Sequence, residues 1–178
     1  MEQNILHSSK KSLILEQSQQ ARNLTKLLVS DVPINLWTAT PVGIDTNIMW
    51  QIGHMIISKN YHSISCIAGF QKEVLDIFPF QEYLTMFGNS SKPMELKGYD
   101  LSPSKMLRQL EEVRELAQSI LLNLDEGQLD APLASSGMAH PIAKTKKEAL
   151  LWCSQHEMWH NGQIAMIKRA LGLKVFIY

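Results

Sequence analysis

Two histidines, one helical turn apart, are the strongest chemical signal in the sequence. They stand at the ends of the segment His156-Glu157-Met158-Trp159-His160. Residues four positions apart lie on the same side of an α-helix, so both imidazoles can bind one metal ion. The segment therefore predicts a divalent-metal site, and zinc or nickel is the expected ion because both suit imidazole ligands.

The same segment has the order H-E-x-x-H of zincin-type metalloproteases, in which the glutamate is the general base. Such a protease takes its third ligand from downstream, but the eighteen residues after His160 contain no His, Asp, Glu or Cys. Gln163 also stands where the extended metzincin motif has its first glycine. A zincin-type protease is therefore the less favoured hypothesis.

Glu157 is the candidate catalytic residue of this segment, as a general base. It lies about 100° around the helix from His156. A salt bridge at the surface or to another helix is therefore at least equally favoured for its carboxylate, and the sequence leaves both alternatives open.

The third ligand has to come from upstream, and His54 is the best candidate. It stands within the apolar run 49–57, on a helix that should face the protein interior. An unpartnered polar group costs about 1–3 kcal/mol there, so a buried imidazole must be hydrogen-bonded or must bind a metal. A single histidine of this kind is more often a hydrogen-bonded core residue, but the three together favour a metal site formed by His54, His156 and His160.

The remaining histidines are weaker ligand candidates. His7 stands in a polar N-terminal stretch, His62 follows Tyr61 near the end of a helical segment, and His140 precedes a proline in a loop.

Two glutamines have the spacing of supporting residues. Gln51 precedes His54 by three positions and Gln163 follows His160 by three. Both are placed to hydrogen-bond a ligand or a bound water, an interaction that fixes the orientation of a metal-binding imidazole. Cys153, one turn before His156, is favoured as an inert core thiol, and we expect both cysteines of the chain to be reduced.

Four amphipathic helices are expected to position these side chains, over about residues 12–30, 47–68, 103–124 and 145–171. They imply an all-α four-helix bundle, in which buried sites are built from facing helices. The long connection 70–101, between helices 2 and 3, is expected to contain a short extra helix near residues 81–87.

Capping residues mark the expected helix ends. Asp45 or Thr46 is the predicted N-cap of the second helix, and Gly69 is its predicted end. Ser102 precedes Pro103 at the start of the third helix, and Thr145-x-x-Glu148 has the pattern of a capping box.

The composition excludes several classes of protein. The chain has 178 residues, 45% of them hydrophobic, and 17 Lys+Arg against 17 Asp+Glu. These values predict one globular domain over residues 1–178 and no nucleic-acid partner, because binding to phosphates needs clustered positive charge. There is no apolar run long enough for a membrane span and no N-terminal secretory signal, so the expected location is cytoplasmic.

Three motifs together resemble the DinB-like (DinB/YfiT) superfamily. They are Asn47-x-x-Trp50-x-x-Gly53-His54, then Thr145-x-x-Glu148-x-Leu150, and finally His156-Glu157-x-x-His160-x-Gly162-Gln163-Ile164, with Leu171-Gly172 at the end of the helix. The resemblance implies a bundle of up-down-down-up topology, a divalent metal held by His54, His156 and His160, and frequently a homodimer. Asn161 departs from the pattern, since many relatives have arginine there.

Three neutral imidazoles would leave a metal with open coordination positions, as in catalytic zinc sites. Such a metal lowers the pKa of bound water or binds a thiol as thiolate. The resemblance implies relatives of both kinds, metal-dependent hydrolases and small-thiol S-transferases. We therefore expect a metal-dependent enzyme acting on a small molecule, with a low-molecular-weight thiol as a candidate partner. The alternative is a non-catalytic metal-binding bundle that acts in a stress response through another protein.

Overall fold

Four long helices form the framework of the protein: α1 (Lys10–Val29), α2 (Ile48–Asn60), α6 (Pro103–Asn123) and α7 (Lys146–Ala170). The computed structural model describes residues 9–93, 101–135 and 137–175. These residues contain no β-strand, only one isolated bridge between Pro132 and Thr145. The predicted all-α four-helix bundle is therefore confirmed.

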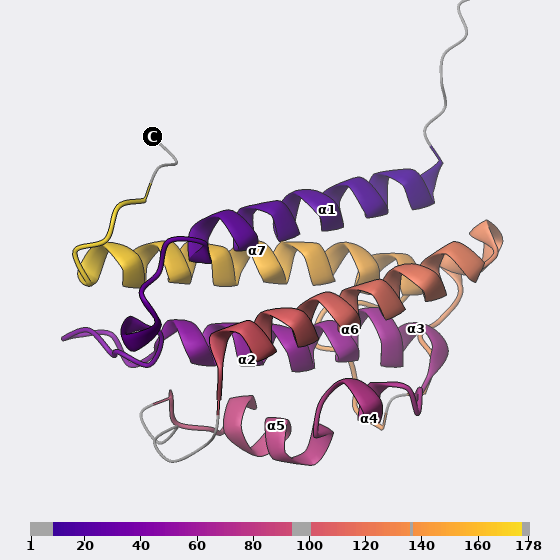
Figure 1. The fold of residues 1–178 in the computed structure, drawn as a ribbon. Helices are drawn as coiled ribbons and strands as arrows, with labels where there is room; N and C mark the ends of the chain where they lie inside the picture. The colour runs from indigo at the N-terminus through magenta and orange to yellow at the C-terminus, as the bar shows by residue number, and fades with distance from the viewer. Residues whose placement is uncertain (1–8, 94–100, 136, 176–178) are drawn as a thin grey trace, which may run out of the picture.

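The four helices have the up-down-down-up order (Figure 1). α1 and α7 run in one direction and lie side by side, whereas α2 and α6 run in the opposite direction and pack on each other. α2 also packs on α7. Two successive helices can run parallel, as α2 and α6 do, only if the connection between them is long, and this connection covers residues 69–102.

Side-chain caps define the helix starts, and one predicted cap is wrong. The Asn47 side chain caps α2 by accepting a hydrogen bond from the backbone N–H of Trp50 at 2.9 Å, in place of the predicted Asp45 or Thr46. The Thr46 hydroxyl is engaged elsewhere, as the acceptor for Gln51 Nε2. Ser102 and the Thr145–Glu148 capping box are confirmed.

The sequence predicted one continuous second helix over about residues 47–68. The structure instead interrupts it with a π-helical turn at Tyr61–Ser65. The short helix α3 (Cys66–Ala68) follows and ends at Gly69, which has a φ of 77°. A π-helical turn accommodates one extra residue and rotates the side chains beyond it, and such turns are frequent at functional sites. Here the turn includes His62, whose side chain is buried.

The long connection contains α4 (Val74–Ile77) and α5 (Phe80–Phe87), so the predicted short helix is confirmed. α5 packs against α2 on the side away from α1 (Figure 1). The contact is close because Gly53 faces the buried ring of Phe87. Within the described ranges, 3-10 turns lie at Ile34–Leu36 and Glu126–Asp130.

The main hydrophobic core lies between the long helices and α5. It contains aliphatic side chains from α2, α6 and α7 together with the aromatic side chains of the connection, among them Ile52, Met55, Ile56, Phe78, Phe87, Met106, Val113, Ile164 and Ile167. Among the helices described, none is both long enough and apolar enough to cross a membrane.

We expect Gly53→Ala to destabilise the fold, because a methyl group there would lie 2.4–2.5 Å from ring carbons of Phe87. Overpacking costs about 1–3 kcal/mol, more than the roughly 1 kcal/mol that alanine gains over glycine in a helix. Gly162→Ala on α7 is the matched control, since nothing lies within 4 Å of its added methyl group. Urea denaturation should show a loss of stability for the first variant and no loss for the second. Equal stability of the two variants would contradict the close α2–α5 contact.

Candidate metal centre

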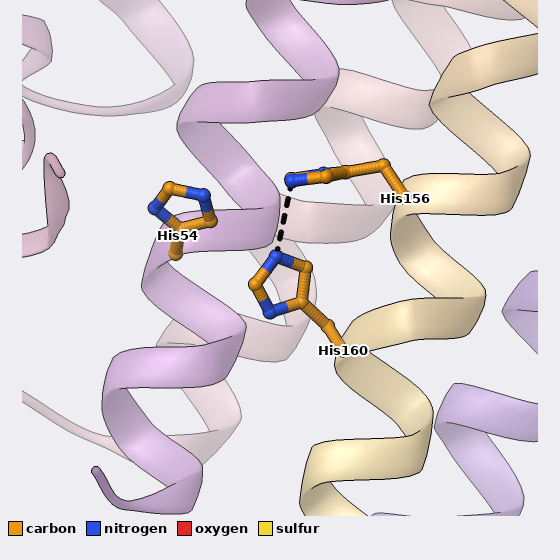
Figure 2. A group of neighbouring side chains, drawn as sticks. All are labelled: His54, His156 and His160. Atoms are coloured by element: carbon orange, nitrogen blue, oxygen red, sulfur yellow. Dashed lines mark hydrogen bonds between the residues drawn. The ribbon is translucent and has the colours of Figure 1, made fainter. Parts of the chain in front are cut away.

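The three predicted ligands converge on one point between α2 and α7 (Figure 2). His54 comes from α2, and His156 and His160 come from successive turns of α7. One ring nitrogen from each lies within 4.8 Å of the other two, and the Nε2 atoms of His156 and His160 are 3.3 Å apart. Nitrogens bound tetrahedrally to zinc at about 2.0–2.1 Å are about 3.4 Å apart. The triad therefore fits a metal ion after a small inward movement of His54.

Hydrogen bonds on the far side of two rings determine which nitrogen can bind a metal. His54 Nδ1 lies 2.7 Å from the backbone oxygen of Phe87, and His160 Nδ1 lies 2.5 Å from Gln51 Oε1. Both oxygens only accept, so each Nδ1 carries the proton and donates it. The Nε2 lone pairs of His54 and His160 are then left for the metal, as in well-ordered metal sites.

Burial keeps the triad in the neutral form that binds metals. His54 and His160 are 8% and 6% exposed, and His156 is partly buried. Burial, followed by the neighbouring imidazoles, lowers the pKa of His160 to about 2. Burial also lowers the pKa of His156 to about 4 and lowers that of His54, where the hydrogen bond to Phe87 opposes the effect.

Two further histidines lie beside the triad, and the sequence did not predict this. The ring of His62 is 5.2 Å from that of His156, and its Nδ1 is 2.8 Å from His140 Nε2. His140 Nδ1 accepts hydrogen bonds from the backbone N–H groups of Ile142 and Ala143. The ring proton of His140 is therefore on Nε2, which donates to Nδ1 of His62. The free lone pair of each ring, at Nδ1 of His62 and at Nδ1 of His140, thus accepts a hydrogen bond, and both residues lie outside the group of three converging histidines. Only the spacing of His62 from His54, about two helical turns, could have indicated its place.

Glu157 points away from the triad into the centre of the bundle. Its Oε2 lies 2.8 Å from Lys59 Nζ on α2, and its Oε1 accepts the hydroxyl of Thr25 on α1. Lys59 and Glu157 are only 4% and 3% exposed. The carboxylate thus forms an interhelix salt bridge, one of the two alternatives left open above. Its role as a general base stays a prediction, and the geometry gives it a structural role.

Of the other residues that the sequence singled out, some contact the three histidines and others lie away from them. Gln51 contacts His160, whereas Gln163 lines a shallow hollow with Trp159 and Met166. Cys153 is buried 3.7 Å from Lys59 Nζ and forms no disulfide with Cys66, which is also buried. Trp50, from the second-helix motif, stacks on the His54 ring at 4.8 Å.

Asn161, which departs from the pattern of relatives, also faces α1. Its Nδ2 donates to the backbone oxygen of Ala21, and its Oδ1 lies 2.8 Å from the Thr25 hydroxyl. The side chain is 1% exposed. The Asn161 side chain therefore joins α7 to α1.

Comparison with known proteins agrees with this arrangement. Residues 17–164 match the sequence profile of the DinB superfamily. The chain belongs to the DinB superfamily. A crystal structure of a conserved protein from Enterococcus faecalis is similar over 92% of this chain and 98% of that one, with a TM-score of 0.69 and 16% sequence identity. That likeness shows the DinB-like fold alone, and no curated protein matches the chain.

The histidine pKa values predict that metal binding will resist acid. Three ordinary imidazoles, with pKa values near 6.5, would lose about 1,000-fold in metal affinity between pH 8 and pH 5.5, because protons compete for each ligand. In this DinB protein His156 and His160 stay neutral at pH 5.5, and only His54 is left to compete, so the loss should be about tenfold at most. Titration with Co²⁺ at the two pH values measures it. A loss near 1,000-fold would show that the triad is not buried as described.

We expect Lys59→Met to destabilise the DinB fold by about 3–5 kcal/mol, because it leaves the Glu157 carboxylate buried without a counter-ion. The double variant Lys59→Met/Glu157→Leu should recover most of this loss. Arg108→Ala is the control, since Arg108 and Glu112 form an exposed pair on α6 worth less than about 1 kcal/mol. Urea denaturation of the three variants tests the ion pair, and a single variant as stable as the double one would contradict it.

Proposed function

We propose that this DinB protein is a metal-dependent enzyme that acts on a small molecule by hydrolysis or by thiol S-transfer. One observation carries the proposal: three neutral histidines face one point, and within the described ranges no fourth His, Cys, Asp or Glu joins them. A tetrahedral or larger coordination shell then has room for a non-protein ligand. When bound there, a zinc or nickel ion would supply Lewis-acid activation of water or of a thiol.

The chain's own residues hold this arrangement rigid. The Phe87 carbonyl and the Gln51 side chain orient two of the imidazoles, and Trp50 covers one face of His54. Trp50 is held in turn by a hydrogen bond from its indole N–H to Ser91. A site whose ligands are fixed by outer contacts keeps its geometry when one coordination position exchanges, which catalysis requires.

Charge supports a small-molecule substrate over a nucleic acid. The chain has no net charge, and binding to phosphate backbones depends on clustered positive side chains. A low-molecular-weight thiol remains the candidate partner from the sequence, and the homodimer and the cytoplasmic location stay predictions.

The proposal is tested by loading the protein with zinc, nickel or manganese and assaying two panels of substrates. One panel pairs small thiols with electrophilic acceptors, and the other contains esters and amides. We expect turnover in one panel, reduced at least 100-fold by His156→Ala, with Arg108→Ala on exposed α6 as the unaffected control.

A spectroscopic measurement separates the enzyme from the alternative. Added thiols should produce a sulfur-to-cobalt charge-transfer band in the Co²⁺-loaded protein if a coordination position is open. A Co²⁺-loaded protein with no such band and no turnover in either panel would favour the non-catalytic metal-binding bundle that acts through a partner.

A further inference from the structure

A cavity opens between α1 and α6, away from the three histidines. α1 packs chiefly on α7 and touches α6 only slightly, which leaves a space of about 250 Å³ at this seam. Its floor is formed by Lys59 of α2 and Cys153 of α7, and none of the three metal-site histidines lines it. The cavity is therefore separate from the metal centre.

The cavity is lined by two buried cations and by one carboxylate, that of the exposed Glu16. Lys59 is paired with Glu157, so its charge is balanced. Arg114 is 7% exposed, and one of its terminal nitrogens, Nη1, donates to the neutral side-chain oxygen of Gln19 at 3.3 Å. Gln19 is exposed, and its amide nitrogen donates to Asn23 Oδ1 at 2.7 Å, so the residue that holds this acceptor lies at the surface.

Arg114 shares its nearest carboxylate with two other cations. Glu111 pairs with Arg22, Lys26 and Arg114, and the carboxylates of Glu115 and Glu157 act on Arg114 from further away. The Nε atoms of Arg22 and Arg114 are buried without a hydrogen-bond partner among the described residues. Burial and the charge of Arg114 lower the pKa of Arg22, and nearby Glu115 and Glu157 do not fully offset this. A buried guanidinium with an unpartnered N–H favours an added hydrogen-bond acceptor, and an anion most of all.

Apolar side chains also line the cavity. Ile14, Leu121 and Leu150 line it, together with Ala117. The volume lies below the 300–1,000 Å³ typical of sites for drug-sized ligands, so the occupant must be smaller. A single negative charge attached to a short hydrocarbon matches a cavity whose lining combines cationic and apolar side chains.

We propose that this cavity binds a small monocarboxylate with a short aliphatic or aromatic tail. The carboxylate replaces the Gln19 oxygen at Arg114 Nη1 and lies near the Lys59 ammonium, and the hydrocarbon packs on Ile14, Leu121 and Leu150. The guanidinium group favours a carboxylate at Nη1, because a hydrogen bond between two charged groups is stronger than one to the neutral Gln19 amide.

The test uses hexanoate and benzoate as probes of the full-length, metal-free protein. Isothermal titration calorimetry should give both acids affinities at least tenfold higher than those of 1-hexanol and benzyl alcohol, and should give inorganic phosphate no measurable binding. Equal affinities for acids and alcohols, binding of phosphate, or no binding of the acids would overturn the proposal.

Variants locate the binding. Arg114→Gln and the cavity-filling Ala117→Leu should each weaken the binding of hexanoate at least tenfold. Ala117→Leu changes no charge, so it tests the site even if Arg114→Gln does not fold. Gln19→Ala should bind hexanoate as tightly as wild type or more tightly, since it removes the competing acceptor. His54→Ala should have no effect, which separates this site from the metal centre. A loss of affinity in Gln19→Ala or His54→Ala equal to that in Arg114→Gln would contradict the assignment.

Discussion

The buried ion pair between Lys59 and Glu157 is the interaction on which the arrangement of this DinB bundle depends. It joins α2 to α7 at the centre of the bundle, and the Thr25 hydroxyl extends it to α1. Because His156 is next to Glu157 in the sequence, an inward carboxylate turns the two histidines of α7 towards the α2 side. The same pair places the Lys59 ammonium at the floor of the α1–α6 cavity. One contact therefore separates a neutral metal-binding side from a charged cavity.

Hydrogen bonds, and not proximity alone, decide which histidines can bind a metal. Five histidines lie in one chain of ring contacts, from His140 through His62 to the triad. A backbone carbonyl and a glutamine oxygen keep protons on Nδ1 of His54 and His160, which leaves Nε2 open. At His140, by contrast, two backbone N–H groups donate to Nδ1 and so occupy its lone pair. The pattern of acceptors and donors thus selects three ligands from five candidates.

The two seams of the bundle have different physical characters. Between α2 and α7 the packing is close and the polar groups are neutral imidazoles with defined partners. Between α1 and α6 the packing is loose, and guanidinium groups share a single carboxylate. Rigid, neutral surroundings suit a metal ion, whereas loose packing beside a buried guanidinium suits an exchangeable anion.

The sequence by itself determined what depends on neighbours along the chain. The spacing of His156 and His160, the Ser102 and Thr145 caps and the helix periods involve residues within one helix, whose geometry is regular. Only the tertiary structure decided what depends on partners from other elements: the Phe87 carbonyl at His54, the Lys59 partner of Glu157, and the position of Gln163 away from the triad. It also decided the π-helical turn beside His62, which no local pattern marks. The physical reason is that a side chain's direction along a helix follows from periodicity, whereas its hydrogen-bond partner is set by how the helices pack.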